Sequence, residues 1–125
     1  CEKAWIVHGA GGLDELSAQH QDANDVAILD NRSVTLRTAT IAVEINPDIR
    51  GGSAEENADE MRALLGGAGR PGHRAAVILN AAAALVVADR ARELDEGTAL
   101  AVQALDSGAA LAVLDKLVAV TRAAP

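Results

Sequence analysis

Aromatic residues are almost absent from this 125-residue chain, which contains a single tryptophan, Trp5, and no tyrosine or phenylalanine. Its core must therefore be built from alanine, leucine, valine and isoleucine, whose small side chains each bury little apolar area. Half of the residues are hydrophobic and 23% are charged, a composition typical of a folded domain rather than a disordered segment. The length predicts one domain that covers residues 1–125.

Cysteine, positive charge and long apolar runs are scarce as well. With Cys1 as the only cysteine, no disulfide can form within the chain, and a reducing compartment is expected. The 11 basic and 18 acidic residues give a net charge of −7, which argues against nucleic acid as a partner because phosphate binding needs Lys and Arg. The longest uncharged stretch, residues 75–88, is shorter than the ~20 apolar residues of a transmembrane helix, so no membrane partner is expected.

Short strands are predicted within the first fifty residues. Residues 4–7 are a compact apolar run that ends at a glycine-rich loop. Residues 25–29 and 33–37 flank the turn-forming cluster 30–32, a pattern that predicts a β-hairpin. Ile41, Val43 and Ile45 alternate with polar or small residues, which predicts one more strand.

After residue 50 the apolar residues take a helical period. A Ser-x-x-Glu capping box at Ser53 and Glu56 predicts the start of a first helix that ends at the glycines after residue 65. A second helix over about 73–92 is apolar nearly all round and is expected to be buried, and a third spans about 95–105. A fourth is capped by Ser107 and runs through residue 122, with an expected inner stripe of Leu111, Leu114, Leu117 and Val118. The fold class is therefore α/β, strand-rich over 1–50 and helical over 51–125.

The most informative stretch for chemistry is residues 8–15, His-Gly-Ala-Gly-Gly-Leu-Asp-Glu, directly after the first strand. Ligands of α/β sheets collect beyond the carboxyl ends of strands, and Asp14 and Glu15 carry the oxygen ligands that Mg²⁺ prefers. Adjacent residues point in different directions in a regular helix, so shared metal binding requires a loop or a first-turn geometry. The alternative is a tight turn whose acidic residues favour a helix N-terminus.

Other polar residues carry two interpretations each. His8 is either a general base or phosphate donor, or a strand-end histidine bonded to the backbone. The N–H groups of residues 51–53 could bind an anion, although a plain helix cap explains them equally well. Asn80, inside an apolar helix, predicts an interhelix or helix–loop hydrogen bond because an unpaired buried amide is costly. His20 and His73 have no metal-ligand spacing and are expected to be solvated.

Four blocks in order resemble the C-terminal part of the anthranilate phosphoribosyltransferases. They are residues 4–9 running into 12–16, then 50–58, then 76–85, and finally 106–110 before the last helix. The resemblance covers almost the whole chain but only about the last third of such an enzyme. It implies the C-terminal portion of a larger α/β domain with a phosphoribosyltransferase/nucleoside-phosphorylase-like fold.

The resemblance also implies a reaction. The family transfers the phosphoribosyl group of phosphoribosyl pyrophosphate to anthranilate in tryptophan biosynthesis, and its members are typically cytoplasmic homodimers. Its acidic pair matches Asp14 and Glu15, which would hold Mg²⁺ on the diphosphate, and His8 and Gly9 match a loop of the same substrate-binding region. No catalytic residue is assigned within this chain.

Three departures from the family pattern bear on activity. The phosphate-binding loop and the anthranilate-contacting residues lie upstream of the family's matching region, so the chain alone is expected to be inactive. The connection over residues 47–51 looks shorter than in the family. Ser53 stands where the family usually has aspartate, and serine caps a helix as well as aspartate does. These departures support an alternative, a non-catalytic binding or assembly module that kept the scaffold without the chemistry.

Overall fold

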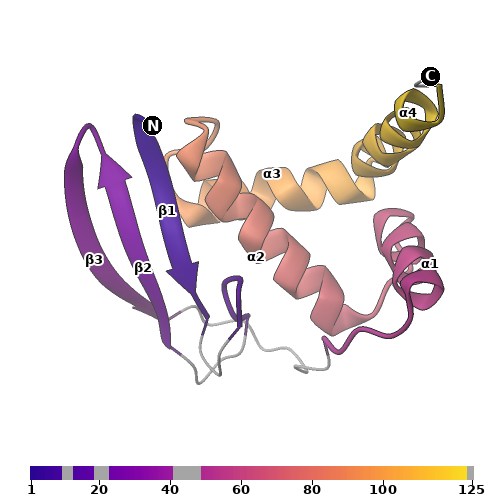
Figure 1. The fold of residues 1–125 in the computed structure, drawn as a ribbon, viewed down its shortest axis with the longest axis horizontal. Helices are drawn as coiled ribbons and strands as arrows, with labels where there is room; N and C mark the ends of the chain where they lie inside the picture. The colour runs from indigo at the N-terminus through magenta and orange to yellow at the C-terminus, as the bar shows by residue number, and fades with distance from the viewer. Residues whose placement is uncertain (10–12, 19–22, 41–48, 124–125) are drawn as a thin grey trace.

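A computed structural model describes residues 1–9, 13–18, 23–40 and 49–123. In these residues a three-stranded antiparallel sheet in the order β1–β2–β3 is followed by four helices (Figure 1), as the sequence predicts. The elements are β1 (Lys3–His8), β2 (Ala23–Asp30), β3 (Ser33–Thr40), α1 (Ala54–Leu65), α2 (Pro71–Val87), α3 (Leu94–Asp106) and α4 (Ala109–Ala123). The strand predicted over 41–45 lies outside the described residues.

The predicted hairpin is confirmed, and its turn has a defined geometry. Asp30 pairs with Ser33, so only Asn31 and Arg32 connect β2 to β3. Both have positive φ angles, 45° and 71°, as a type I′ turn requires, and such turns match the right-handed twist of the strands. The backbone N–H of Asn31 also donates to the carbonyl of Glu2, which fixes the turn against the start of β1.

The main core lies between one face of the sheet and the helix pair α2 and α3. Leu16, Val26, Leu79 and Ala83 form its buried centre, and half-buried side chains pack around them: Trp5, Val7, Ala18, Ile28 and Leu94. The alternation of a strand places Trp5, Val7, Val26 and Ile28 on the same face. We call this face, which packs against α2 and α3, the inner sheet face.

Helix α2 is shifted relative to its predicted limits. It begins at Pro71, whose missing N–H suits the first helical position, and ends at Val87 rather than near residue 92. Asp89 has a φ of 54°, and the N–H groups of Arg90 and Ala91 both donate to the carbonyl of Leu85. This chain reversal stops the helix without a glycine or proline, which explains why the sequence pattern missed it.

Helices α2 and α3 cross at a very short distance because a glycine lies between them. A Cβ atom added to Gly97 would lie 2.7 Å from the carbonyl oxygen of Ala82 and 2.9 Å from its Cα. Both residues are buried. The small side chains of α2 and the facing Gly97 thus let the two helix backbones pack closely, in a core that has few large side chains.

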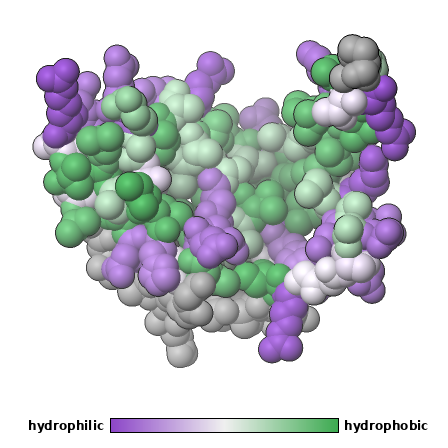
Figure 2. All heavy atoms as spheres, viewed as in Figure 1, coloured by the Kyte–Doolittle hydropathy of each residue, from purple (hydrophilic) through white to green (hydrophobic). Residues whose placement is uncertain are grey.

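The helices at the C-terminal side are less buried than the sequence predicts. None of the residues of α4 is fully buried. Leu111, Leu114 and Val118 of the expected inner stripe are half-buried, whereas Leu117 is 57% exposed, so the expectation is wrong for Leu117. In α2, Val77 is 40% exposed and lines an apolar hollow between α2, α3 and the start of α4, visible in the centre of Figure 2. The described chain therefore provides too few elements to cover these side chains.

No single helix among the described residues is long and apolar enough to cross a membrane. Helices α3 and α4 reach that length only together, and they meet at a bend of 67°.

Candidate functional site

The loop after β1 is closed by a pair of backbone hydrogen bonds. The N–H of Gly9 donates to the carbonyl of Leu13 at 3.0 Å, and the N–H of Leu13 donates to that of Gly9 at 3.2 Å. A Cβ atom on Gly9 would collide with the carbonyl oxygen of Glu15 and lie 2.9 Å from the Cβ of Leu13. Glycine is therefore required here for the close approach of two backbone segments, and His8, just before it, is exposed at the end of the strand.

The acidic pair follows this closure directly. Asp14 is exposed and Glu15 is half-buried, and neither belongs to a helix. The expectation of acidic residues at a helix N-terminus is therefore wrong, and the pair lies in a loop. Among the described residues, no third His, Cys, Asp or Glu joins them in a cluster.

Asn80 of α2 binds the backbone of Leu16, the residue that directly follows the acidic pair. Its Oδ1 accepts the N–H of Leu16 at 2.9 Å, and its Nδ2 donates to the carbonyl of Leu16 at 3.1 Å. Nδ2 also donates to the carbonyl of Ala76, one turn earlier in the same helix, at 2.9 Å. The predicted helix–loop hydrogen bond is confirmed, and it acts on the residue next to Glu15.

Asn24 of β2 makes the same arrangement with the next residue. Its Oδ1 accepts the N–H of Ser17 at 2.7 Å, and its Nδ2 donates to the carbonyl of Ser17 at 3.0 Å. Asn24 is fully buried, and Ser17 is 1% exposed. The sequence did not single out Asn24, because an amide beside a turn-rich segment is common and its partner is seven residues away.

Two asparagines from different elements thus fix consecutive residues, and the Gly9–Leu13 bonds fix the other end of the segment. Asp14 and Glu15 lie between these attachments, so their backbone is ordered before any ligand binds. Mg²⁺ is commonly bound through one or two carboxylates and completes its six ligands with water and substrate phosphates. A pair of carboxylates on a fixed loop, with no third protein ligand beside it among the described residues, fits that donor set.

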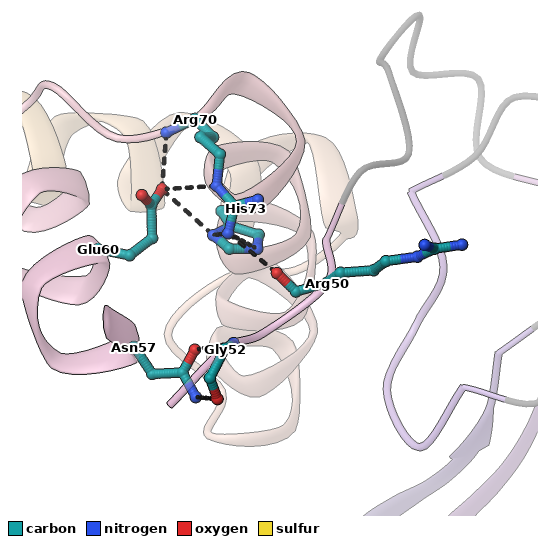
Figure 3. Close-up of polar contacts among 6 residues, drawn as sticks. All are labelled: Arg50, Gly52, Asn57, Glu60, Arg70 and His73. Atoms are coloured by element: carbon teal, nitrogen blue, oxygen red, sulfur yellow. Dashed lines mark hydrogen bonds and ion pairs between the residues drawn. The ribbon is translucent and has the colours of Figure 1, made fainter. Parts of the chain in front are cut away.

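A second polar cluster joins α1 to the start of α2 (Figure 3). The carboxylate of Glu60 accepts the backbone N–H of Arg70 at 2.8 Å and lies 3.2 Å from Nδ1 of His73. The guanidinium of Arg70 donates to the carbonyl of Arg50 at 3.0 Å. The side chain of His73 is only 17% exposed, so the expectation of a solvated histidine is wrong. His20 lies outside the described residues.

The electrostatics of this cluster favour the charged carboxylate. The backbone N–H of Arg70 lowers the pKa of Glu60 below its ordinary value of 4.5, and the Arg70 charge and the His73 hydrogen bond act in the same direction. Each member is satisfied by another member. The cluster is therefore a structural tie between α1, α2 and the segment before α1, and the sequence could not reveal it because Glu60 and His73 are 13 residues apart.

Two backbone N–H groups before α1, those of Gly52 and Ser53, are bonded to side chains of the same chain. The N–H of Gly52 donates to Oδ1 of Asn57 at 2.8 Å (Figure 3), and the N–H of Ser53 donates to Glu56 at 2.7 Å. The hydroxyl of Ser53 in turn accepts the N–H of Glu56 at 3.2 Å, which completes the predicted capping box. The helix-cap interpretation is confirmed, and two of the three N–H groups considered for an anion, those of Gly52 and Ser53, are occupied.

Comparisons with known proteins agree on one family. A family model described as "Glycosyl transferase family, a/b domain" matches residues 1–111. Anthranilate phosphoribosyltransferases of Methylobacterium nodulans and Rhodopseudomonas palustris are 48% and 44% identical and match 97% and 98% of this chain. The crystal structure of anthranilate phosphoribosyltransferase from Thermus thermophilus covers 97% of the chain with a TM-score of 0.78 at 33% identity.

The chain spans only about a third of the length of these proteins. The matched region is 36% of the Methylobacterium protein and 36% of the Thermus structure. The alignment with the Rhodopseudomonas protein extends over 134 positions, more than the 125 residues of this chain. That relative therefore has residues without a counterpart here, whereas their location at residues 47–51 stays a prediction.

Proposed function

This chain belongs to the glycosyl transferase family and is part of its α/β domain, and from this membership we propose that it is the C-terminal part of an anthranilate phosphoribosyltransferase. The observation that carries the proposal is the identity of 41–48% to such proteins over most of the chain. The substrates would be phosphoribosyl pyrophosphate and anthranilate, and the complete protein would form a homodimer. The rest of that enzyme would provide the main phosphate-binding loop and the anthranilate pocket.

Within this enzyme we propose that Asp14 and Glu15 hold Mg²⁺. The support is the chemistry of their oxygens and the fixed backbone on both sides of the pair. A bound magnesium ion would neutralise charge that develops on the departing pyrophosphate.

The remaining residues of the site would act by position. Gly9 allows the loop to close on the Glu15 backbone, and Asn80 and Asn24 keep the following residues in place. A carboxylate pair held in one geometry loses little freedom when a ligand binds, so more of the binding free energy is available for orientation. His8, exposed beside the loop, would contact the substrate by hydrogen bonding.

Calorimetric titration of the chain with pyrophosphate in excess Mg²⁺ tests the metal site. We expect Asp14→Asn with Glu15→Gln to weaken Mg²⁺-dependent binding at least about tenfold, equivalent to ~1.4 kcal/mol. The matched control is Glu55→Gln with Asp59→Asn, which removes two exposed charges from α1 and should leave binding unchanged. Equal binding by the site variant and the unsubstituted chain would overturn the metal assignment.

A chimeric enzyme tests the reaction. The chain would replace the matching segment of the Methylobacterium nodulans protein, and phosphoribosylanthranilate formation would be followed. We expect turnover by the chimera and none by the 125-residue chain alone. Turnover by the isolated chain would contradict the predicted inactivity, and a folded but inactive chimera would favour the non-catalytic module.

A further inference from the structure

A second segment of the chain is held in the same way as the loop of the acidic pair. It covers residues 50–53, directly before α1. Oδ1 of Asn57 accepts the N–H of Gly52 at 2.8 Å, and Nδ2 of Asn57 donates to the carbonyl of Gly52 at 3.2 Å. Asn80 makes the same two-bond arrangement with Leu16. The carbonyl of Arg50 accepts from Arg70, so the main chain is fixed on both sides of residue 51.

The side chain of Arg50 takes no part in these contacts. Arg50 is exposed, and only its carbonyl is bonded, so its guanidinium has no hydrogen-bond or ion-pair partner among the described residues. Figure 3 shows the side chain extended away from Glu60 and His73, toward the side of the view on which the strands lie. A cation on a fixed main chain and without an internal partner is available for a ligand.

The other arginines whose side chains the structure describes differ from Arg50 in pairing or in place. Arg32 and Arg90 have no ion pair among the described residues, but both lie near the start of β1. The turn that contains Arg32 contacts Glu2, and the end of α2, directly before Arg90, contacts Lys3. Arg122 lies in the last turn of α4. The rest are paired with carboxylates: Arg62, Arg70, Arg74 and Arg92.

Arg50 lies at the opposite edge of the molecule, where β1 ends. Figure 1 shows the segment before α1 and the loop after β1 at the same lower edge. Helix α2 connects the two segments, because its Asn80 binds Leu16 and Arg70, directly before the helix, binds the carbonyl of Arg50. The described structure therefore presents an unpaired cation and the carboxylate pair at one edge.

We propose that Arg50 is a phosphate-binding residue, whose guanidinium donates hydrogen bonds to the diphosphate group that Mg²⁺ on Asp14 and Glu15 would hold. This inference rests on the proposed function. One magnesium ion cancels only part of the negative charge of a diphosphate, and the planar guanidinium can donate two parallel hydrogen bonds to phosphate oxygens. The fixed main chain at Arg50 reduces the freedom that is lost on binding.

Calorimetric titration of the chain with inorganic pyrophosphate in excess Mg²⁺ tests this assignment. We expect Arg50→Gln to weaken binding at least about fivefold. Arg50→Lys should have a smaller effect, because an ammonium group keeps the charge but not the planar pair of donors. The matched control is Arg122→Gln, which removes an exposed arginine from the end of α4 and should leave binding unchanged.

Urea unfolding separates binding from a structural role. The substitution keeps the carbonyl of residue 50, which is the group that Arg70 binds. Arg50→Gln should therefore unfold at the same urea concentration as the unsubstituted chain. A lower midpoint together with weaker pyrophosphate binding would mean that the side chain supports the fold, and it would overturn the assignment.

The chimeric enzyme distinguishes this inference from the proposed function. In an active chimera, Arg50→Gln should raise the KM for phosphoribosyl pyrophosphate at least about fivefold, and Arg122→Gln should not change it. An unchanged KM would overturn the role of Arg50, whatever the isolated chain binds, while the proposed function stands. Weaker pyrophosphate binding by Arg50→Gln beside a folded but inactive chimera would support the phosphate site and contradict the proposed function.

Discussion

The side-chain amide of Asn80 makes with Leu16 the two hydrogen bonds that a neighbouring β-strand would make. It accepts the N–H of Leu16 at 2.9 Å and donates to its carbonyl at 3.1 Å. Leu16 is 1% exposed, so water cannot take over these bonds. Removing the amide leaves a buried donor and a buried acceptor unsatisfied, each at a cost of about 1–3 kcal/mol. We therefore expect Asn80→Leu to lower the free energy of unfolding by about 2 kcal/mol or more in urea denaturation.

The control for this variant is Gln103→Leu, which makes the same change from amide to leucine at an exposed position of α3. It should shift the free energy of unfolding by less than about 0.5 kcal/mol. A similar small shift for Asn80→Leu would mean that the amide contributes nothing to the position of the loop.

Glu60 predicts a pH dependence of stability at the junction of α1 and α2. Its pKa in the folded chain lies below the ordinary value of 4.5, first because the backbone N–H of Arg70 donates to the carboxylate. A depressed pKa stabilises the folded state above the pKa of the unfolded chain, and this contribution is lost as the pH falls through the folded value. We expect Glu60→Gln to be less stable than the unsubstituted chain at pH 7 and the difference to close below about pH 4.5.

Urea unfolding midpoints between about pH 3 and pH 8 measure this effect. Glu55→Gln is the control, because Glu55 is exposed on the same helix and no hydrogen bond of its side chain is seen in the described structure. A gap between Glu60→Gln and the unsubstituted chain that stays constant down to about pH 3 would show that the carboxylate charge is not what stabilises the cluster.

Gly97 predicts a substitution that helix propensity alone would judge favourable. Alanine is about 1 kcal/mol better than glycine in a helix interior. A Cβ at this position, however, would lie 2.7 Å from the carbonyl oxygen of Ala82 and would force α2 and α3 apart. We expect Gly97→Ala to lower stability by about 1–3 kcal/mol, as overpacking does, measured by thermal and urea unfolding.

Gln103→Ala on the same helix tests propensity without packing, because the side chain is exposed. This control should be neutral or slightly stabilising. Increased stability of Gly97→Ala would show that the two helices can separate at no cost.

The hairpin turn predicts a stabilising substitution. Arg32 has a φ of 71°, a left-handed conformation that costs a residue with a Cβ roughly 1 kcal/mol relative to glycine. Arg32→Gly should therefore raise the free energy of unfolding by about 0.5–1 kcal/mol, and Arg32→Ala should not. If both variants behave alike, the effect comes from the lost charge and not from the backbone.

Local signals in the sequence were sufficient for the strands and for the helix caps. The apolar run ending at Val7, the turn at Asn31 and the capping box at Ser53 each depend on residues close together in the chain, and all three are confirmed. The end of α2 was missed because Asp89 stops the helix by a left-handed conformation that aspartate adopts only in a suitable tertiary setting.

The site shows the same division between local and distant contacts. The sequence predicts a paired amide at Asn80, but its partner Leu16 is 64 residues away, and neither Asn24 nor the pairing of Glu60 with His73 has a signal in sequence spacing. The prediction that Leu117 is buried fails for a different reason. Its helical spacing with other apolar residues of α4 is correct, but no described element covers it.

The two asparagine clamps have a consequence for how freely the loop can change. Asn80 and Asn24 hold the main-chain N–H and carbonyl groups of Leu16 and Ser17, so these four hydrogen bonds do not depend on which side chains stand at positions 14 and 15. The contacts that support the loop backbone are therefore separate from the side chains of Asp14 and Glu15. Substitutions at positions 14 and 15 therefore leave these supporting hydrogen bonds in place.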